Sequence, residues 1–534
     1  MSQRAKTLTK FAVVFMSFVT IFGFRNIINN GFQFGLLASV LFLIGGAIYA
    51  IPMVLITSEF GSIKKLENQE SGLGSFCNFA LGGKGGFLAS WASYFGNLFF
   101  FATIAPFTVV ATSYCVYGAN GFDKITELLT KEGWGDNSAR MSTTVLACCA
   151  ILIFWAGTYI SKQGPKWIGK ITTIGGMASI TLGLLFIIIA LCYTIPTGKV
   201  VAGFGNSAAW NPVSSEDWWS FLSAFPWLIF AYNGIETMSA FIKDVKGGAK
   251  SFKFASLIGM GVVIFVMVIG VIVLSATITQ ENISRWGIVN SYYFVFPQIL
   301  GLELDSTAGK VVIHIVGFIT AVSGFGSMFF WTAGPAKVFF SEVPSGVMGK
   351  YLSKTDKNGM PTNALLVQAI VVTVILLAFG LTTAGHYNFV KNTIKQNDFF
   401  ERITQAATSL ATVQMFFYFF AYIRLRLKMD DEERSIVFFK NKWIPITISI
   451  ISLILLSIAF FFGTVPSPVT WKADWSNALI DFLLIFGGFI FFMGVGVLVW
   501  YLNVERKAKL NGTDGSQGTA KIAKTKPKTA KVTK

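Results

Sequence analysis

Long apolar runs are the feature that most limits what this 534-residue chain can fold into. A helix needs about 20 predominantly apolar residues to cross the hydrocarbon core of a bilayer, which is about 30 Å thick. Twelve stretches of the required length and hydropathy follow one another along the chain. They cover residues 9–32, 36–60, 86–117, 141–160, 167–194, 218–243, 254–278, 309–340, 362–383, 400–427, 443–463 and 477–503.

The composition supports a chain that lies mostly in lipid. Only 13% of the residues are charged, whereas about 25% are charged in ordinary soluble domains. A water-soluble protein of this length would not cover its surface with so few charges. We therefore expect an all-α polytopic membrane protein with about twelve transmembrane helices, one membrane domain over residues 1–505, and membrane lipids as its surroundings.

The net charge of +17 raises the question of a nucleic-acid partner, but the positions of the charges argue against one. With the N-terminus inside, 32 of the 43 Lys and Arg residues fall on the inner side and 8 fall in outer loops. This asymmetry is the positive-inside pattern of membrane proteins. It predicts a multi-pass protein of the cell membrane with both termini cytoplasmic, and the excess charge is explained by topology and by attraction to anionic lipid.

The last segment, 506–534, differs in composition from the membrane domain. It is rich in Lys, with Gly, Ser, Thr and Ala between, and it contains no aromatic residue and no apolar run. Such a segment cannot bury enough apolar surface to fold, so we expect a disordered basic cytoplasmic tail. Two roles remain open for it: a solvated tail near anionic lipid, or a plug that gates the protein.

Two of the predicted helices are interrupted by Gly and polar residues. The first contains Gly23-Phe24-Arg25-Asn26, and the sixth contains Asn233-Gly234-Ile235-Glu236. Helix 1 opens one group of five helices and helix 6 opens the next, so the breaks fall at corresponding positions of a 5+5 inverted-repeat core. Breaks placed in this way are the best sequence indication of a transporter binding site. Unwinding frees backbone groups that lipid cannot satisfy, so they are tolerated where they line a cavity.

Two charged residues at the breaks are candidates for the site. A carboxylate in mid-helix, such as Glu236, costs about 2.5–3.5 kcal/mol on membrane-insertion scales. Glu236 either contacts substrate or a gate, or caps the freed N–H groups of the second half-helix. Arg25 either extends to the outer interface or faces the cavity, where it can pair with Glu236 or hold a substrate carboxylate.

Residues for ion coupling are less clearly marked. Lys170 lies deepest of three Lys at the inner start of helix 5 and is a candidate proton carrier or a fixed substitute for a sodium ion, although inner-side charge explains it equally. Thr320, Ser323 and Ser327 of helix 8 are candidate sodium ligands, or simply packing residues. The five Cys and two His show no metal-ligand spacing, so neither metal nor cofactor is expected.

The sixth segment carries a recognisable motif. Phe230-Ala231-Tyr232-Asn233-Gly234-Ile235-Glu236-Thr237-Met238-Ser239-Ala240, followed by Asp244-Val245, resembles the signature of the amino acid/polyamine/organocation (APC) transporter superfamily. Other stretches resemble its glutamate/GABA antiporter-like family over roughly residues 11–430. They are Ser58-Glu59-Phe60-Gly61-Ser62, Glu70-Ser71-Gly72, Gly334-Pro335-Ala336-Lys337 and Lys357-Asn358-Gly359-Met360-Pro361.

The resemblance implies a LeuT-like fold and an amino acid as the small-molecule substrate. It also implies that the two breaks bind the charged groups of the amino acid, with Phe230 where relatives carry an aromatic lid. The predicted substrate-binding residues are Gly23, Phe24, Arg25, Asn26, Phe230, Tyr232, Asn233, Gly234, Ile235 and Glu236. This chain has Gly-Phe-Arg where the family has a Gly-Ser-Gly type of break.

The sequence thus predicts a secondary active amino acid transporter, a permease or antiporter that works by alternating access and is driven by exchange or by protons. A sodium-coupled amino acid symporter is the alternative within transport, and a membrane-embedded enzyme or a channel is the alternative of another class. Enzyme signatures such as a phosphate-binding Gly-rich loop or a nucleophile elbow are absent from the sequence. The amino acid and the oligomeric state stay open.

The charge asymmetry yields a prediction about topology. Protease added to intact cells should leave the Lys-rich tail at 506–534 uncut, because the positive-inside pattern keeps it in the cytoplasm. Immunodetection of an epitope fused to the C-terminus measures this. Permeabilised cells, in which the same protease removes the epitope, are the control. Cleavage in intact cells would contradict the predicted topology and the loop assignments that depend on it.

Overall fold

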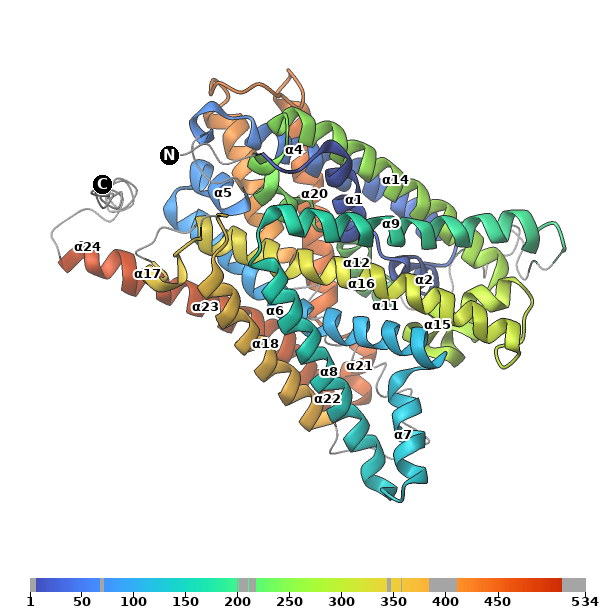
Figure 1. Cartoon of the computed structure of the whole chain (residues 1–534). Helices are drawn as coiled ribbons and strands as arrows, with labels where there is room; N and C mark the ends of the chain where they lie inside the picture. The colour runs from blue at the N-terminus through green and yellow to red at the C-terminus, as the bar shows by residue number, and fades with distance from the viewer. Residues whose placement is uncertain are drawn as a thin grey trace, which may run out of the picture.

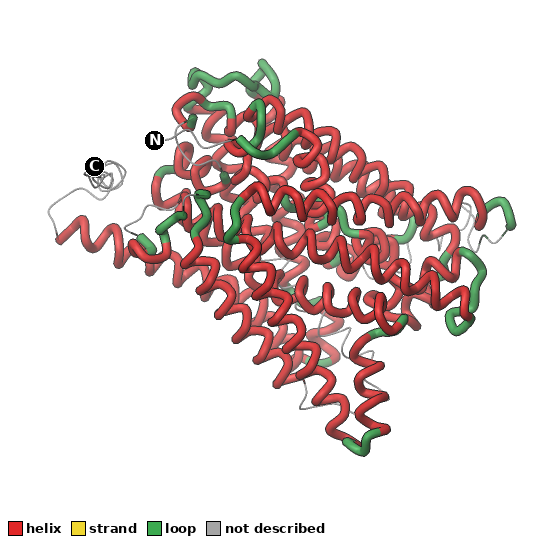
Figure 2. Tube along the Cα trace, in the orientation of Figure 1, coloured by secondary structure: helices red, strands yellow, loops and turns green. Residues whose placement is uncertain are grey.

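The computed structural model describes residues 6–67, 72–198, 200, 210, 218–342, 347–356, 358–383 and 411–510. These residues are mostly helical and form no β-strand, although two isolated bridges, Leu8 with Val245 and Ile63 with Arg434, occur among them (Figure 2). The all-helical class predicted from the sequence is therefore observed in the described part of the chain.

The helices follow one another closely along the chain. The α-helices are α1 (Lys10–Ile21), α2 (Phe24–Phe34), α3 (Leu37–Gly45), α4 (Ile51–Gly61), α5 (Leu73–Leu81), α6 (Gly83–Tyr117), α7 (Gly121–Lys131), α8 (Ser138–Ser161), α9 (Pro165–Ile189), α11 (Trp218–Ser223), α12 (Phe225–Phe230), α13 (Ile235–Met238), α14 (Gly248–Thr277), α15 (Gln280–Ile299), α16 (Thr307–Glu342), α17 (Gly349–Leu352), α18 (Thr362–Thr383), α20 (Trp443–Thr464), α21 (Pro468–Ala473), α22 (Trp475–Phe482), α23 (Gly488–Trp500) and α24 (Arg506–Leu510). A further helix runs through residues 411–428. The π-helical turns are η1 (Gly46–Ala50), η4 (Ala190–Thr194), η7 (Leu483–Gly487) and η8 (Tyr501–Glu505), and the 3₁₀ turns are η2 (Lys64–Leu66), η3 (Gly135–Asn137) and η5 (Ser239–Asp244).

Eight helices in the described residues are long and apolar enough to cross a membrane. They span Leu37–Gly61, Gly83–Tyr117, Ser138–Ser161, Pro165–Thr194, Gly248–Thr277, Thr307–Phe340, Trp443–Ala473 and Ile485–Glu505. The pair α1 and α2, bent by 41° at its break, makes a ninth when it is counted as one span. Each of these nine coincides with one of the runs predicted from hydropathy.

The other three predicted runs differ from a continuous span for separate reasons. The run at 218–243 is divided into α11, α12, α13 and η5, because the helix is interrupted as the sequence predicted. The run at 362–383 is α18, whose apolar part covers residues 362–377. For the run at 400–427, residues 400–410 lie outside the described residues, and the remainder is helical.

The long helices form a bundle around the broken ones. α16 packs against α6, α9 and α8, and α1 packs against α9 and α14. Figure 1 shows α5, α17 and α24 at one end of this bundle and α7 and α15 at the other. The first end carries the segments rich in Lys and Arg, and the second carries the predicted outer loops 118–140 and 279–308. These loops form helices of their own, and α15 reaches back far enough to place Tyr292 at the central cavity.

The broken first helix is held by close contacts with α9. A Cβ at Gly176 of α9 would lie 2.1 Å from the carbonyl oxygen of Phe15 in α1, and a Cβ at Gly175 would lie 2.7 Å from the Cα of Gly326 in α16. Small residues at such crossings allow backbones to approach where the lipid offers no hydrophobic driving force. Gly175 and Gly176 thus allow α16 and α1 to pack closely against the same helix, α9.

This crossing yields a prediction about stability. The substitution Gly176→Ala should lower the thermal midpoint in detergent, because an added methyl group in a packed interface costs about 1–3 kcal/mol. Gly261→Ala in α14 is the matched control, since a Cβ at this exposed helical position meets no heavy atom within 4 Å. Equal melting temperatures for the two variants would show that α1 and α9 tolerate separation.

Candidate functional site

The break in the first helix consists of two extended residues, Phe22 and Gly23, between two helical segments. α1 ends at Ile21, Gly23 has φ −131° and ψ 129°, and α2 begins at Phe24. Polar side chains take up the carbonyl groups that the break exposes. Asn26 Nδ2 donates to Ile21 O at 3.4 Å, and Ser179 Oγ of α9 donates to Phe22 O at 3.3 Å. Gly23 therefore interrupts the helix without leaving these two acceptors unpaired.

The break in the sixth helix depends on Gly234. This residue has φ 132°, a conformation that residues with side chains rarely adopt, and a Cβ there would lie 2.4 Å from the methyl group of Thr20. α12 ends at Phe230 and α13 begins at Ile235. The second half is only one α-helical turn followed by the 3₁₀ turn η5, so the regular half-helix expected from the sequence is replaced by a tighter, shorter one.

Glu236 caps this second break. Its carboxylate accepts a hydrogen bond from Gly234 N at 2.8 Å, from Gln414 Nε2 at 3.3 Å and from Thr237 Oγ1 at 3.5 Å. The side chain is buried. In the described residues its hydrogen bonds thus come from neutral donors, and the pairing with Arg25 that the sequence suggested for the empty protein is not formed. A carboxylate at the start of a helical turn is favoured by the exposed N–H groups there.

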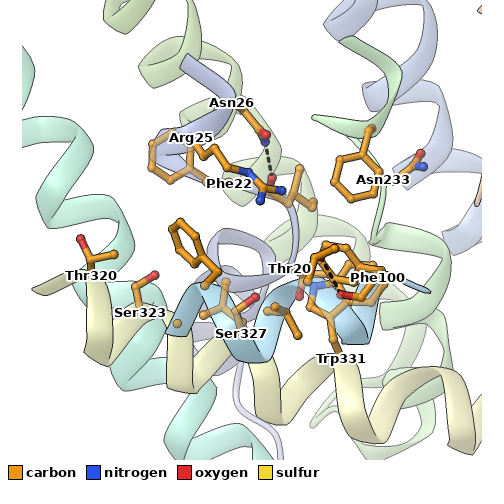
Figure 3. A pocket seen from close by; sticks show the side chains of 18 of the residues that line it. Thr20, Phe22, Arg25, Asn26, Phe100, Asn233, Thr320, Ser323, Ser327 and Trp331 are labelled. Carbon is orange, nitrogen blue, oxygen red and sulfur yellow. Dashed lines mark hydrogen bonds between the residues drawn. The ribbon is translucent and has the colours of Figure 1, made fainter. Parts of the chain in front are cut away.

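A cavity of about 100 Å³ lies between the two breaks (Figure 3). For comparison, an engineered cavity of about 150 Å³ holds a molecule of benzene, so this space is smaller than a benzene site. The wall is formed by α1, the first turn of α2, α6, the end of α12, α15 and α16. Its lining residues are Val19, Thr20, Ile21, Phe22, Gly23, Arg25, Asn26, Phe100, Thr103, Ile104, Phe107, Phe230, Asn233, Tyr292, Thr320, Ser323, Gly324, Ser327 and Trp331.

Arg25 gives this cavity its charge. Among the described lining residues it is the one Lys or Arg, and none of them is Asp or Glu. The Arg25 guanidinium carbon lies 5.6 Å from the centroid of the Phe107 ring, a cation–π distance. Figure 3 shows Arg25 and Asn26 on one side of the space, with Thr320, Ser323 and Ser327 along α16 on the other. The structure therefore places Arg25 at the cavity rather than at the outer interface.

The cavity brings together part of the predicted set. Gly23, Arg25, Asn26, Phe230 and Asn233 line it, as do the coupling candidates Thr320 and Ser323 and their neighbour Ser327. Phe230 packs edge-on against Phe100, at 5.4 Å between ring centroids, and Phe100 packs against Trp331 at 5.0 Å. An aromatic group of three residues from separate helices thus bounds one side of the cavity.

Other predicted residues lie behind the wall. The Phe24 ring packs among Phe186, Tyr292 and Phe296. The remaining ones belong to the sixth-helix break, where Tyr232, Gly234, Ile235 and Glu236 are buried. Lys170 is exposed on the far side of α9, with its Nζ 5.0 Å from the centroid of the Trp167 ring, so it does not line the cavity.

Several lining residues were not found from the sequence. Phe100, Thr103, Ile104 and Phe107 come from α6, and Tyr292 comes from α15. The α6 residues belong to a continuous apolar run in which nothing distinguishes a cavity wall from a lipid-facing side. The one available signal was Pro106, which lies inside this helix and next to Phe107. Tyr292 lies in a segment that hydropathy assigns to an outer loop.

Buried polar contacts join the start of the first helix, the sixth-helix segment and α16. Lys337 Nζ of α16 donates to Asp244 Oδ2 at 2.8 Å and to Ala240 O at 2.6 Å, and both side chains of this ion pair are 1% exposed. Leu8, before α1, exchanges backbone hydrogen bonds with the segment after η5: Leu8 N donates to Asp244 O at 2.9 Å, and Lys246 N donates to Leu8 O at 2.8 Å. The segment before α1, the end of η5 and α16 are thus joined to one another.

A bundle of membrane-spanning helices with a cavity at two helix breaks is the architecture of a membrane transporter. The comparisons with known proteins agree with this class. The model of the amino acid permease family matches residues 8–504, and the chain belongs to this family. Its function is accordingly the transport of amino acids across a membrane, and it is not an enzyme.

Three relatives illustrate the range of the family. The inner membrane transporter YjeM of Salmonella typhimurium is 23% identical over 518 residues, 94% of this chain and 97% of that protein. The aspartate/glutamate permease AcaP of Lactococcus lactis subsp. cremoris is 22% identical, over 91% of this chain and 94% of its own length. The glutamate/gamma-aminobutyrate antiporter of the same organism is 24% identical over 63% of this chain and 62% of its own length.

The buried ion pair yields a prediction about stability. Replacing Lys337 by Ala should destabilise the closed conformation by about 3–5 kcal/mol, because it leaves the buried Asp244 carboxylate without this cation. The double variant Lys337→Met with Asp244→Asn should recover part of the loss, since it removes both charges. The measurement is thermal unfolding of the purified protein in detergent. A double variant as unstable as Lys337→Ala would show that the ion pair is not the cause.

Proposed function

We propose that the chain is a secondary active transporter that moves amino acids by alternating access through the cavity between the breaks of helices 1 and 6. It works as an exchanger or with protons as the coupling ion. The observation that supports this proposal is the cavity itself, whose lining includes Arg25 together with Gly23 and Asn233 from the two unwound segments. Sites of this kind lie near the bilayer midplane, where one repeat of the fold moves against the other.

The proposal includes the full topology. The nine spans identified above are joined by the broken sixth helix, by α18 and by the helix that contains residues 411–428, which gives twelve crossings with a 5+5 inverted-repeat core. Both termini then lie in the cytoplasm of the cell. The basic segments at the α5, α17 and α24 end of the bundle support this orientation (Figure 1). Of the basic tail predicted at 506–534, residues 506–510 form α24, which continues directly from η8, and residues 511–534 lie outside the described residues.

The closed end explains why a conformational change is needed. With the N-terminus inside, the Lys337–Asp244 pair and the Leu8 contacts close the cytoplasmic path below the cavity. Release to the cytoplasm requires these contacts to separate. Binding energy from the substrate shifts the balance between the closed and open arrangements only if substrate binds them differently.

Substrate binding is proposed to begin at Arg25. Its guanidinium has a planar set of donors that suits a carboxylate, and it is the cation of the described cavity wall. The ammonium group of an amino acid is then held by carbonyl groups of the unwound segments. Glu236 serves this site indirectly, because it caps Gly234 and so fixes the shape of the break rather than lining the cavity.

The charge of the wall favours an acidic amino acid. A lining with one Arg and no carboxylate is neutralised by a substrate of net charge −1, and a desolvated charge is less costly when it is paired. The names of two relatives, an aspartate/glutamate permease and a glutamate/gamma-aminobutyrate antiporter, favour the same substrate class. Counterflow in proteoliposomes loaded in turn with each common amino acid tests this preference. Exchange of basic amino acids alone would contradict it.

Sodium coupling remains the second candidate within transport. Thr320 and Ser323 belong to the cavity lining, where each contributes a hydroxyl group. Hydroxyl oxygens of this kind are suitable ligands for a small hard cation. Uptake into vesicles with sodium or with choline outside distinguishes the two mechanisms: exchange continues in choline, whereas sodium symport stops.

Arg25 provides the direct test of the proposed site. Arg25→Ala should weaken amino acid binding roughly ten- to hundredfold, because a charge-assisted hydrogen bond contributes about 1.5–3 kcal/mol. Arg25→Lys should restore binding only in part, since the planar fork of donors is lost. Lys166→Ala, which removes an exposed cation at the start of α9, is the control. The measurement is ligand-induced thermal stabilisation, and parent-like binding by Arg25→Ala would contradict the proposal.

A further inference from the structure

Two buried hydrogen bonds join the second predicted membrane helix to the break in the sixth. Tyr49 OH donates to Asn233 Oδ1 at 2.9 Å, and Tyr232 OH donates to Phe42 O at 2.7 Å. Tyr49 is 3% exposed and Tyr232 is 2% exposed. The two bonds run in opposite directions, one donated from each side, so they hold the sixth-helix break against α3 and η1.

A π-helical turn places Tyr49 opposite Asn233. The turn η1 lies between α3 and α4, within the continuous span Leu37–Gly61. Such turns insert an extra residue into a helix, re-aim the side chains beyond it and occur often at functional sites. Ser452 Oγ of α20 donates to Ile48 O in this turn at 3.1 Å. A Cβ at Gly46 would lie 2.7 Å from Ile264 Cδ1, so the turn is also packed closely against α14.

The bond from Tyr49 determines what Asn233 presents to the cavity. Its Oδ1 is occupied by the tyrosine hydroxyl, which leaves the Nδ2 group as the end of the amide available for another partner. This Nδ2 has no hydrogen-bond partner in the described residues, although Asn233 is only 4% exposed and lines the cavity. Buried donors are nearly always paired, so an unpaired one in a cavity wall indicates a position where a ligand supplies the acceptor.

We propose that Tyr49 is a positioning residue for substrate recognition, which orients the Asn233 amide so that its NH₂ group donates to an oxygen of the substrate's carboxylate. The inference rests on the proposed function and adds to it a second donor beside Arg25. Figure 3 shows Arg25 and Asn233 at the same cavity, on segments from the two broken helices. A substrate carboxylate bound between Arg25 and Asn233 accepts a hydrogen bond from each of the two broken helices. Its recognition therefore requires both breaks to be in place.

The test is a double-mutant cycle in the full chain reconstituted in proteoliposomes, with radiolabelled L-glutamate as the probe. Tyr49→Phe removes the hydroxyl and keeps the ring, and Asn233→Ala removes the amide. Each should raise KM roughly three- to tenfold, as expected for one hydrogen bond, with the maximal rate within about twofold of the parent. The double variant should be no worse than Asn233→Ala, because Tyr49 acts through Asn233.

Tyr418→Phe is the matched control. Its hydroxyl makes a buried hydrogen bond of 2.8 Å with Thr57 of α4, which also joins this part of the chain to another helix but does not reach the cavity lining. Its KM should stay within about twofold of the parent. A KM increase as large as that of Tyr49→Phe would show that loss of a buried tyrosine bond, and not the position of Asn233, is responsible, and would overturn the inference.

Asn233→Asp keeps the test decisive if the Asn233→Ala variant does not fold. It preserves the acceptor for Tyr49 and replaces the NH₂ donor by a carboxylate oxygen, so L-glutamate affinity should fall tenfold or more. Parent-like affinity in Asn233→Asp, or additive effects of Tyr49→Phe and Asn233→Ala, would overturn the inference. A parent that exchanges amino acids other than L-glutamate contradicts only the acidic preference, and the cycle then uses the amino acid it carries. A parent that exchanges none contradicts the proposed function itself.

Discussion

The structure depends on how the chain satisfies backbone groups that it exposes inside a membrane. Lipid offers neither donors nor acceptors, so each interrupted helix needs partners from the protein. At the first break these are the amide of Asn26 and the hydroxyl of Ser179, and at the second the carboxylate of Glu236 accepts from Gly234 N. The cavity exists because these partners allow two helices to stop in the middle of the bundle.

The same constraint separates residues that shape the site from residues that face it. Glu236 and Tyr232 belong to the sixth-helix break, yet their polar atoms are directed to Gly234 N and Phe42 O, away from the cavity lining. Asn233, between them in sequence, lines the cavity. A mutation at Glu236 is therefore expected to act by distorting the break, whereas one at Arg25 removes a contact from the wall.

Much of the fold was predictable because membrane spans and breaks leave strong sequence signals. Gly, Asn and a charged residue inside an apolar run marked both breaks, which the structure places at Gly23 and Gly234. Pairing across space left no such signal. The sequence could not show that Glu236 bonds to Gln414 rather than to Arg25, nor that Phe100 faces the cavity while Lys170 faces outward. In an all-apolar helix, hydropathy has no period that separates a wall from a lipid-facing side.

Two buried ionic groups at the closed end are built differently, and this difference bears on how the end can open. The Glu59 carboxylate of α4 is bound by Arg426 and Arg434, each at 2.9 Å, by Tyr422 OH at 2.8 Å and by Phe438 N at 2.9 Å. This cluster joins α4 to the helix through 411–428 and to the segment after it. To separate them would expose several charges at once, so these elements are expected to move as one body. The Lys337–Asp244 pair crosses instead from α16 to η5, where Lys337 Nζ also donates to Ala240 O, so one ammonium group joins the broken helix to α16. A pair of this kind can part when water enters and solvates both groups, which makes it the weaker boundary and the natural plane along which the cytoplasmic path opens.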